Sequence, residues 1–126
     1  MRYKFFWPIG WALLILAVSL LPADHPVARA STLGGLDTMA HIFAYCVLAL
    51  LVFYAMRDLS TGVGLGCAIA IPASLGVFVE IVQPALGRAG SWKDVAANGA
   101  GVAVGAVLGS LWATLSRRES DETGED

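Results

Sequence analysis

Charged side chains are scarce in this sequence of 126 residues. They make up 14% of the chain, whereas hydrophobic residues make up 57%, and the mean hydropathy is +0.70. A soluble domain typically carries about a quarter charged residues. The shortage excludes an ordinary water-soluble domain, because so apolar a chain must place much of its surface in lipid.

Basic residues and cysteines are few as well. Lys and Arg together number 8 and form no basic stripe, which argues against a nucleic-acid partner. The net charge of −2 arises from acids in the last six residues, so the remaining body is mildly basic. The 2 cysteines, Cys46 and Cys67, fall inside apolar runs and are expected to be buried thiols rather than a disulfide or a metal pair. We expect no cofactor.

Long apolar runs are what the sequence does contain. They cover residues 5–21, 39–56, 63–82 and 95–115. Each has the length of a helix that crosses a hydrocarbon core about 30 Å thick, and backbone groups in lipid must be bonded within their own segment. The sequence therefore predicts an all-α fold, an integral membrane bundle of four transmembrane helices. Residues 1–116 form this membrane domain, and 117–126 form a disordered, acidic, cytoplasmic tail.

Basic residues near the ends of the runs indicate the orientation, because Lys and Arg are enriched on the cytoplasmic side. With both termini inside, the cytoplasmic residues are Arg2, Lys4, Arg57, Arg117 and Arg118, and the outer residues are Arg29, Arg88 and Lys93. The larger group favours cytoplasmic termini. An alternative reading takes the first run as a secretory signal that is cleaved after "ARA", before Ser31.

Polar residues interrupt the apolar pattern at three run ends. Alternation of the helices brings these ends to one side of the membrane, which is the outer side in the orientation above. The residues are Asp37, His41 and Tyr45 on the second run, Glu80 and Gln83 on the third, and Asp94 and Asn98 on the fourth, with Arg88 between the last two. Spacings of four and three place each set on one helical face. We expect a polar site there.

Glu80 is the strongest candidate for function, because a carboxylate among apolar neighbours in a membrane is costly and marks a site by default. We expect Glu80 and His41 to act as acid and base, since imidazole titrates near neutral pH. The structural alternative is an ion-pair network of Glu80, Arg88 and Asp94 that only fixes helix register. Metal binding by His41, Glu80 and Asp94 suits the ligand types but lacks a diagnostic spacing, and we expect no metal.

Small residues continue the polar face of the fourth run. Gly101, Gly105 and Gly109 repeat every four residues. Small residues at this spacing let membrane helices approach closely. They predict tight helix packing and a homo-oligomer formed through these glycines.

These motifs resemble those of VanZ-like membrane proteins. "LDTMAHIFAYCVLALL" is similar to the family's Asp-Lys-x-x-His-x-x-x-Tyr motif, and "VFVEIVQPALGRAGSWKDVAANGAGVAVGAVLG" is similar to its Glu-x-x-Gln, Gly-Arg and Asp-x-x-x-Asn-x-x-Gly motifs. The resemblance covers residues 37–109. One departure is Thr38, which stands where the family usually has Lys; if that Lys supplies a cation, Arg88 or Lys93 must replace it.

The resemblance implies a bacterial envelope protein whose named relative is linked to low-level teicoplanin resistance. By motif position, the binding residues it implies are Asp37, Tyr45, Gln83, Arg88, Asp94 and Asn98. The function that we expect is modification of an envelope lipid, in which Arg88 binds an anionic head group. Two alternatives are a non-catalytic protein that binds a lipid, a cell-wall precursor or a drug's acyl tail, and a structural membrane subunit.

Overall fold

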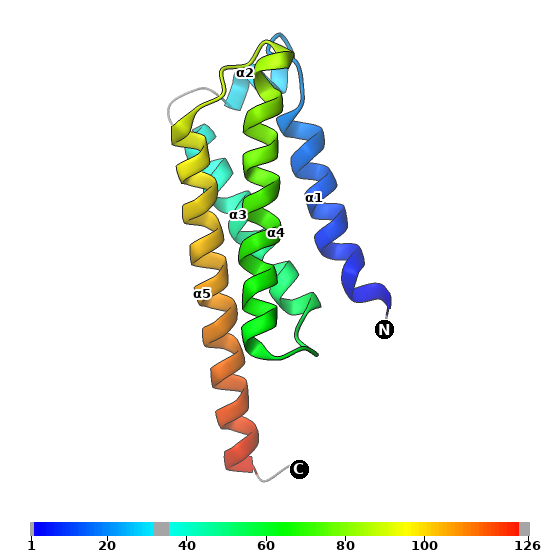
Figure 1. Cartoon of the computed structure of the whole chain (residues 1–126), viewed down its shortest axis with the longest axis vertical. Coiled ribbons are helices and arrows are strands. Elements are labelled where there is room, and N and C mark those ends of the chain that lie inside the picture. The colour runs from blue at the N-terminus through cyan, green and yellow to red at the C-terminus, as the bar shows by residue number, and fades with distance from the viewer. Residues whose placement is uncertain (1, 32–35, 124–126) are drawn as a thin grey trace.

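The computed structural model describes residues 2–31 and 36–123, and this part of the chain contains helices only. The elements are η1 (Arg2–Phe5), α1 (Phe6–Ser19), α2 (Pro26–Ser31), α3 (Leu36–Ala55), α4 (Thr61–Val82), η2 (Gln83–Leu86) and α5 (Trp92–Thr123). α1, α3, α4 and α5 run side by side, and the short α2 lies at the end where α1 and α4 finish (Figure 1). The predicted all-α fold is confirmed.

Three segments are long and apolar enough to cross a bilayer. They are Leu36–Ala55, Thr61–Leu86 and Trp92–Glu119, whereas the apolar segment Tyr3–Ser19 is shorter. The chain is thus a helical membrane-type bundle of three long apolar helices and a shorter one, where four transmembrane helices were predicted. α1 is a helix of 14 residues instead of the expected run 5–21. It ends ahead of Pro22, because the residue before a proline disfavours helical geometry.

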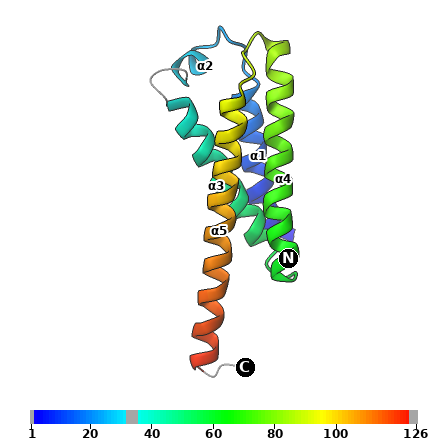
Figure 2. The same ribbon diagram turned by 60° about the vertical axis from the view of Figure 1, so that its left-hand side comes forward.

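The core of the bundle is the contact between α3 and α5, and α4 packs against both (Figure 2). Glycines of α5 make this close approach feasible. A Cβ on Gly101 would overlap the carbonyl oxygen of Ile42, and a Cβ on Gly105 would overlap that of Cys46. A Cβ on Gly109 would lie 2.9 Å from the Phe53 ring. The predicted tight packing therefore occurs within one chain. The homo-oligomer expected through the same glycines stays a prediction, and it would have to displace α3.

α5 is longer than predicted and continues to Thr123, past the expected end at 115. Residues 117–123 of the predicted disordered tail are thus helical in the structure, and residues 124–126 lie outside the described part. Arg and Glu are good helix formers, so this polar stretch continues the helix that the apolar stretch starts. Arg117 also donates a hydrogen bond from Nη2 to Thr61 Oγ1 at 2.6 Å, which ties α5 to the start of α4.

α1 packs mainly against α3 and only lightly, since Pro8 and Ile15 are its only buried residues. The indole Nε1–H of Trp11, in α1, donates a hydrogen bond to the Ala44 carbonyl oxygen at 2.9 Å. Before α1 begins, Lys4 forms an ion pair with Asp58 in the α3–α4 loop. This hydrogen bond lowers the pKa of the Asp58 carboxyl, and it attaches the N-terminal segment to the bundle.

Candidate functional site

The polar residues of three helices meet at the end of the bundle where α2 lies. His41 occupies the second turn of α3, Glu80 the last turn of α4, and Asn98 the second turn of α5. All three are buried. The convergence that alternation predicted is confirmed for these residues. The chemical roles assigned to them stay predictions.

His41 is held between two partners. Its Nδ1 lies 2.7 Å from Asn98 Oδ1, and its Nε2 lies 3.5 Å from Asp37 Oδ1. The ring of Tyr45 stacks parallel to the imidazole, with centroids 6.5 Å apart. Because Asn98 presents an oxygen, Nδ1 carries the proton and donates it. The other ring nitrogen, Nε2, faces the Asp37 carboxylate.

Asp94 completes this group from α5. One oxygen each of Asp37 and Asp94 and one ring nitrogen of His41 all lie within 4.8 Å of one another. Asp37 and Asp94 are only half-buried, so water reaches this cluster. The sequence considered a metal set that contained Glu80, whereas the structure gathers Asp37 with His41 and Asp94 instead.

Glu80 joins the end of α4 to the start of α5. Its Oε2 accepts a hydrogen bond from the Ser91 backbone N–H at 3.1 Å. Ser91 is the residue before α5, and its Oγ accepts from the Lys93 N–H at 3.2 Å, as a helix N-cap does. Glu80 therefore has a structural role in fixing where α5 begins, in addition to any chemistry.

Three buried polar atoms have no hydrogen-bond partner among the described residues. They are the Tyr45 hydroxyl, Glu80 Oε1 and Asn98 Nδ2. Leaving a buried polar atom unpaired costs roughly 1–3 kcal/mol. Such a concentration at one end of the bundle indicates a site that binds water or a ligand, because a purely structural network would pair these atoms internally.

Arg88 and Gln83 lie beside this cluster and bind the end of α1. Arg88 Nη1 donates to the Ser19 carbonyl at 2.9 Å, and Gln83 Nε2 donates to the same oxygen at 3.3 Å. Gly87 has φ +73, a left-handed conformation that ends η2 and starts the turn leading to Arg88. One guanidinium nitrogen is thus used within the chain, and the other donors of Arg88 can reach a ligand.

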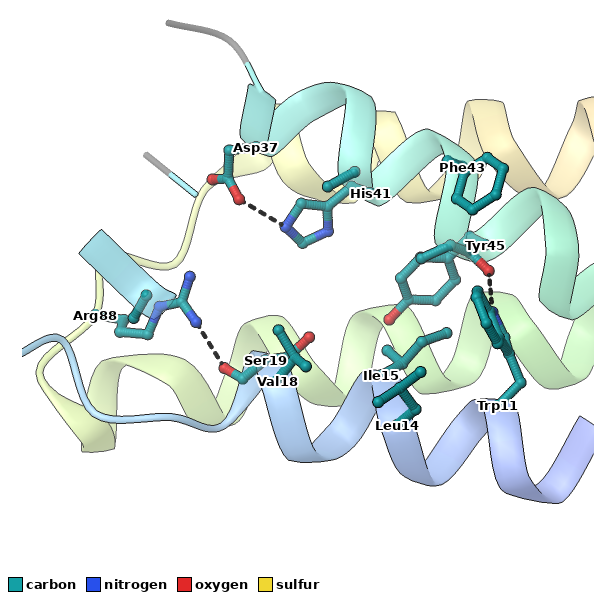
Figure 3. Close-up of a pocket in the computed structure, with 13 residues that line it drawn as sticks. Trp11, Leu14, Ile15, Val18, Ser19, Asp37, His41, Phe43, Tyr45 and Arg88 are labelled. Atoms are coloured by element: carbon teal, nitrogen blue, oxygen red, sulfur yellow. Dashed lines mark hydrogen bonds and ion pairs between the residues drawn. The ribbon is translucent and has the colours of Figure 1, made fainter. Parts of the chain in front are cut away.

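A cleft of about 270 Å³ runs between α1 and α3, and the site residues that line it are Asp37, His41, Tyr45 and Arg88. Figure 3 shows Asp37, His41 and Arg88 at one end, the Tyr45 hydroxyl directed into the cleft, and Trp11 and Phe43 at the other end. The remaining walls are mostly apolar and include Leu14, Ile15 and Val18. The cleft is therefore polar at the end near α2 and apolar along the rest of its length.

The sequence pointed to eight site residues but missed Ser19, Ser91 and Gly76. The Ser19 contacts and the contact of the Ser91 N–H with Glu80 use backbone groups, which carry no sequence signal. The Ser91 side chain did have a signal, because serine is a preferred residue just before a helix. Gly76 did have a sequence signal, because it lies four residues before Glu80 and therefore on the same face of α4. A Cβ there would come within 3.1 Å of Asn98 Nδ2 and 3.2 Å of the Tyr45 ring, so glycine lets α4 approach both side chains.

Comparison with known protein families identifies the family of this helical bundle. A family model described as VanZ/LLP1 matches residues 10–113. The chain belongs to the VanZ/LLP1 family. No curated protein and no solved structure matches it.

The VanZ/LLP1 match includes α1 and extends beyond the motif region 37–109, so it covers the cleft as well as the polar cluster. In this VanZ/LLP1 protein, the start of α3 carries Thr38 at the position where the motif resemblance leads us to expect lysine. Arg88 lies within electrostatic range of Asp94, as does Lys93. These two cations are the ones that the sequence proposed as substitutes for the missing lysine.

Proposed function

We propose that this protein binds an amphipathic lipid of the bacterial envelope in the α1–α3 cleft. The observation that supports this is the division of the cleft into a polar end and an apolar length. An acyl chain fits beside Leu14 and Val18, and the head group lies at Arg88, Asp37 and His41. Ligand sites commonly combine apolar walls with a few placed polar groups, and about 300 Å³ is the lower end of their range. The cleft therefore accommodates a head group and part of one chain.

The charges at the polar end favour a head group that carries both an anion and a donor. Arg88 offers free guanidinium donors, which match phosphate oxygens. Asp37 and Asp94 lie close by and would repel a purely anionic ligand. A phosphate next to a hydroxyl or an amine satisfies both features. Phospholipids and lipid-linked cell-wall precursors share this chemistry.

Leu14→Trp should block lipid binding by filling the cleft, whereas Leu13→Trp should not. Leu14 lines the cleft, and its neighbour Leu13 is 60% exposed on α1 and does not line it. Native mass spectrometry of the protein extracted from membranes measures the bound lipid. We expect at least a tenfold loss of the lipid-bound fraction for Leu14→Trp, and a fraction like the wild type for Leu13→Trp. Equal lipid retention by the two variants would contradict the proposed site.

A second candidate function, chemical modification of the bound lipid, has its own support. Glu80 Oε1 is buried without a hydrogen-bond partner among the described residues, and the Glu80 carboxyl lies within electrostatic range of His41. His41 lines the α1–α3 cleft, and Glu80 lines a separate pocket with Ser91 and Trp92 at the same end of the bundle. A buried carboxyl and a histidine near each other are the parts that acid–base catalysis needs. In this proposal Glu80 and His41 move the proton, and Asp37 positions the imidazole.

We further propose that the polar end faces outward in the cytoplasmic membrane, with both termini in the cytoplasm. A role in glycopeptide resistance follows if the cleft holds a precursor or the acyl tail of a drug such as teicoplanin. Two single cysteines test the orientation. Asp24→Cys lies in the loop between α1 and α2, and Leu59→Cys lies in the α3–α4 loop at the opposite end. In intact cells a membrane-impermeant thiol reagent should label only Asp24→Cys, and the reverse pattern would refute the orientation.

A further inference from the structure

Three side chains at the polar end of the bundle converge on a single point. Asp37 and His41 belong to α3 and Asp94 to α5, and one potential ligand atom of each lies within 4.8 Å of the other two. Carboxylate oxygens and imidazole nitrogens are ligands that zinc takes in proteins. We propose that Asp37, His41 and Asp94 bind a divalent transition-metal ion, with Zn²⁺ as the expected ion.

The distance between Asp37 and His41 suits two ligands of one ion better than a direct contact. Their Oδ1 and Nε2 atoms are 3.5 Å apart. A charge-assisted hydrogen bond would bring them to about 2.7–2.9 Å. Two ligands at about 2.1 Å from a tetrahedral zinc are roughly 3.4 Å from each other. Asp94 then needs a shift of about an ångström to complete the set, which a half-buried side chain can make.

The protonation of His41 also fits a metal ligand. Asn98 Oδ1 lies 2.7 Å from Nδ1 and fixes the proton there. When a metal ion is bound, the electron pair that ligates it is then the one on Nε2, the nitrogen that faces Asp37. Metal-binding histidines almost always donate their other N–H to a carboxylate or carbonyl oxygen, which fixes the ring and its tautomer. Asn98 is 3% exposed and occupies that supporting position.

The negative charge around these three side chains would stabilise a bound cation. Asp37, Asp94 and Glu80 are three carboxyl groups within electrostatic range of one another, and the basic groups that face Asp94 are His41, Arg88 and Lys93. Arg88 already donates to the Ser19 carbonyl. Glu80 Oε1 is buried and has no hydrogen-bond partner among the described residues, so it is available to accept a hydrogen bond from water on the ion. A divalent ion would balance the two carboxylates that an anionic head group would otherwise meet.

The donor set selects among ions. Imidazole suits zinc and its neighbours, whereas Mg²⁺ and Ca²⁺ prefer oxygen ligands alone. Three protein ligands leave a position open, as in zinc sites that bind a substrate. If the lipid proposal holds, the open position lies at the head-group end of the cleft, where a phosphate oxygen can occupy it. Ion binding itself does not depend on the lipid.

Zinc titration of the purified full-length protein tests this site. After EDTA treatment and removal of the chelator, we expect one equivalent of Zn²⁺ to bind, measured by competition with a chromophoric chelator. His41→Gln, Asp37→Asn and Asp94→Asn should each weaken binding by at least tenfold. The matched controls are His25→Gln and Asp24→Asn, which remove the other histidine and an exposed aspartate from the same end of the molecule. These controls should bind like the wild type. Millimolar Mg²⁺ should not compete.

A second measurement separates loss of ligands from loss of folding. Co²⁺ bound in place of zinc should give the intense visible absorption of a tetrahedral site, and only variants with a wild-type thermal melting curve are compared. Binding that is unchanged in all three ligand variants, or equally weakened in the controls, would overturn the proposal. Lipid retention by the metal-free protein is measured in parallel, so that a failure of the metal site and a failure of the lipid site give different results.

Discussion

Gly105→Ala should destabilise the protein by about 1–3 kcal/mol, the usual cost of overpacking a well-packed interface. The added methyl group would overlap the Cys46 carbonyl oxygen and lie 2.8 Å from the Ala49 Cβ. Backbone of α3 cannot rotate away as a side chain can, so α3 and α5 must separate. Because their contact is the core of the bundle, the whole fold loses stability. Unfolding in a detergent titration, followed by tryptophan fluorescence, measures the loss.

Gly99→Ala is the matched control on the same helix. No atom lies within 4 Å of a Cβ at Gly99. Alanine is a better helix former than glycine by roughly 0.5–1 kcal/mol, so this variant should be as stable as the wild type or slightly more stable. If Gly105→Ala and Gly99→Ala unfold at the same detergent concentration, the described approach of α3 to α5 is wrong.

Glu80→Gln should abolish function in cells while leaving the fold intact, if the protein modifies its lipid. Glutamine keeps a side-chain oxygen that can accept the Ser91 N–H, so the start of α5 remains tied to α4. It cannot exchange a proton, and general acid–base catalysis contributes about 10²–10⁴-fold in rate. Lipid and muropeptide profiles of a deletion strain that carries Glu80→Gln should match those of the deletion itself and differ from wild type.

Two further variants make the Glu80 result interpretable. Asp24→Asn removes an exposed carboxylate at the same end and should restore the wild-type profile. Glu80→Ala removes the Ser91 contact as well as the charge, so it should also lower stability. A Glu80→Gln strain with a wild-type profile would exclude proton transfer by Glu80 and leave lipid binding as the function. Identical profiles in the deletion and the wild type would exclude envelope chemistry altogether.

Helix positions were predictable because hydropathy and alternation act at the level of whole segments. The sequence placed α3 at 39–56 and α4 at 63–82, and the structure has Leu36–Ala55 and Thr61–Val82. It could not predict the length of α5, since the polar residues after 116 suit a helix and a disordered tail equally well. It also missed α2, which is too short to give a periodic signal.

Part of the site was predictable from spacing alone. His41 and Asn98 were expected on facing helices, and they bond to each other. The sequence also held an unused signal that the Glu80 side chain points into the bundle. Glu80 continues a stripe of small residues that repeats every four positions along α4. Gly64, Ala68, Pro72 and Gly76 form this stripe, and all are buried. The prediction that Asp37 and Asp94 lie at the same end of the bundle followed from helix alternation, whereas their close grouping with His41 depends on the rotation of α3 against α5 about their long axes.

The attachment of α1 has a consequence for how a lipid gains entry. Arg88 and Gln83 bind the carbonyl at its end, Lys4 attaches the segment before it, and Trp11 and Ile15 anchor the stretch between to α3. Few contacts therefore have to break for the middle of α1 to move away from α3. In the lipid-binding proposal, an acyl chain enters between these two helices from the surrounding leaflet, so binding needs no aqueous passage and no rearrangement of the other helices.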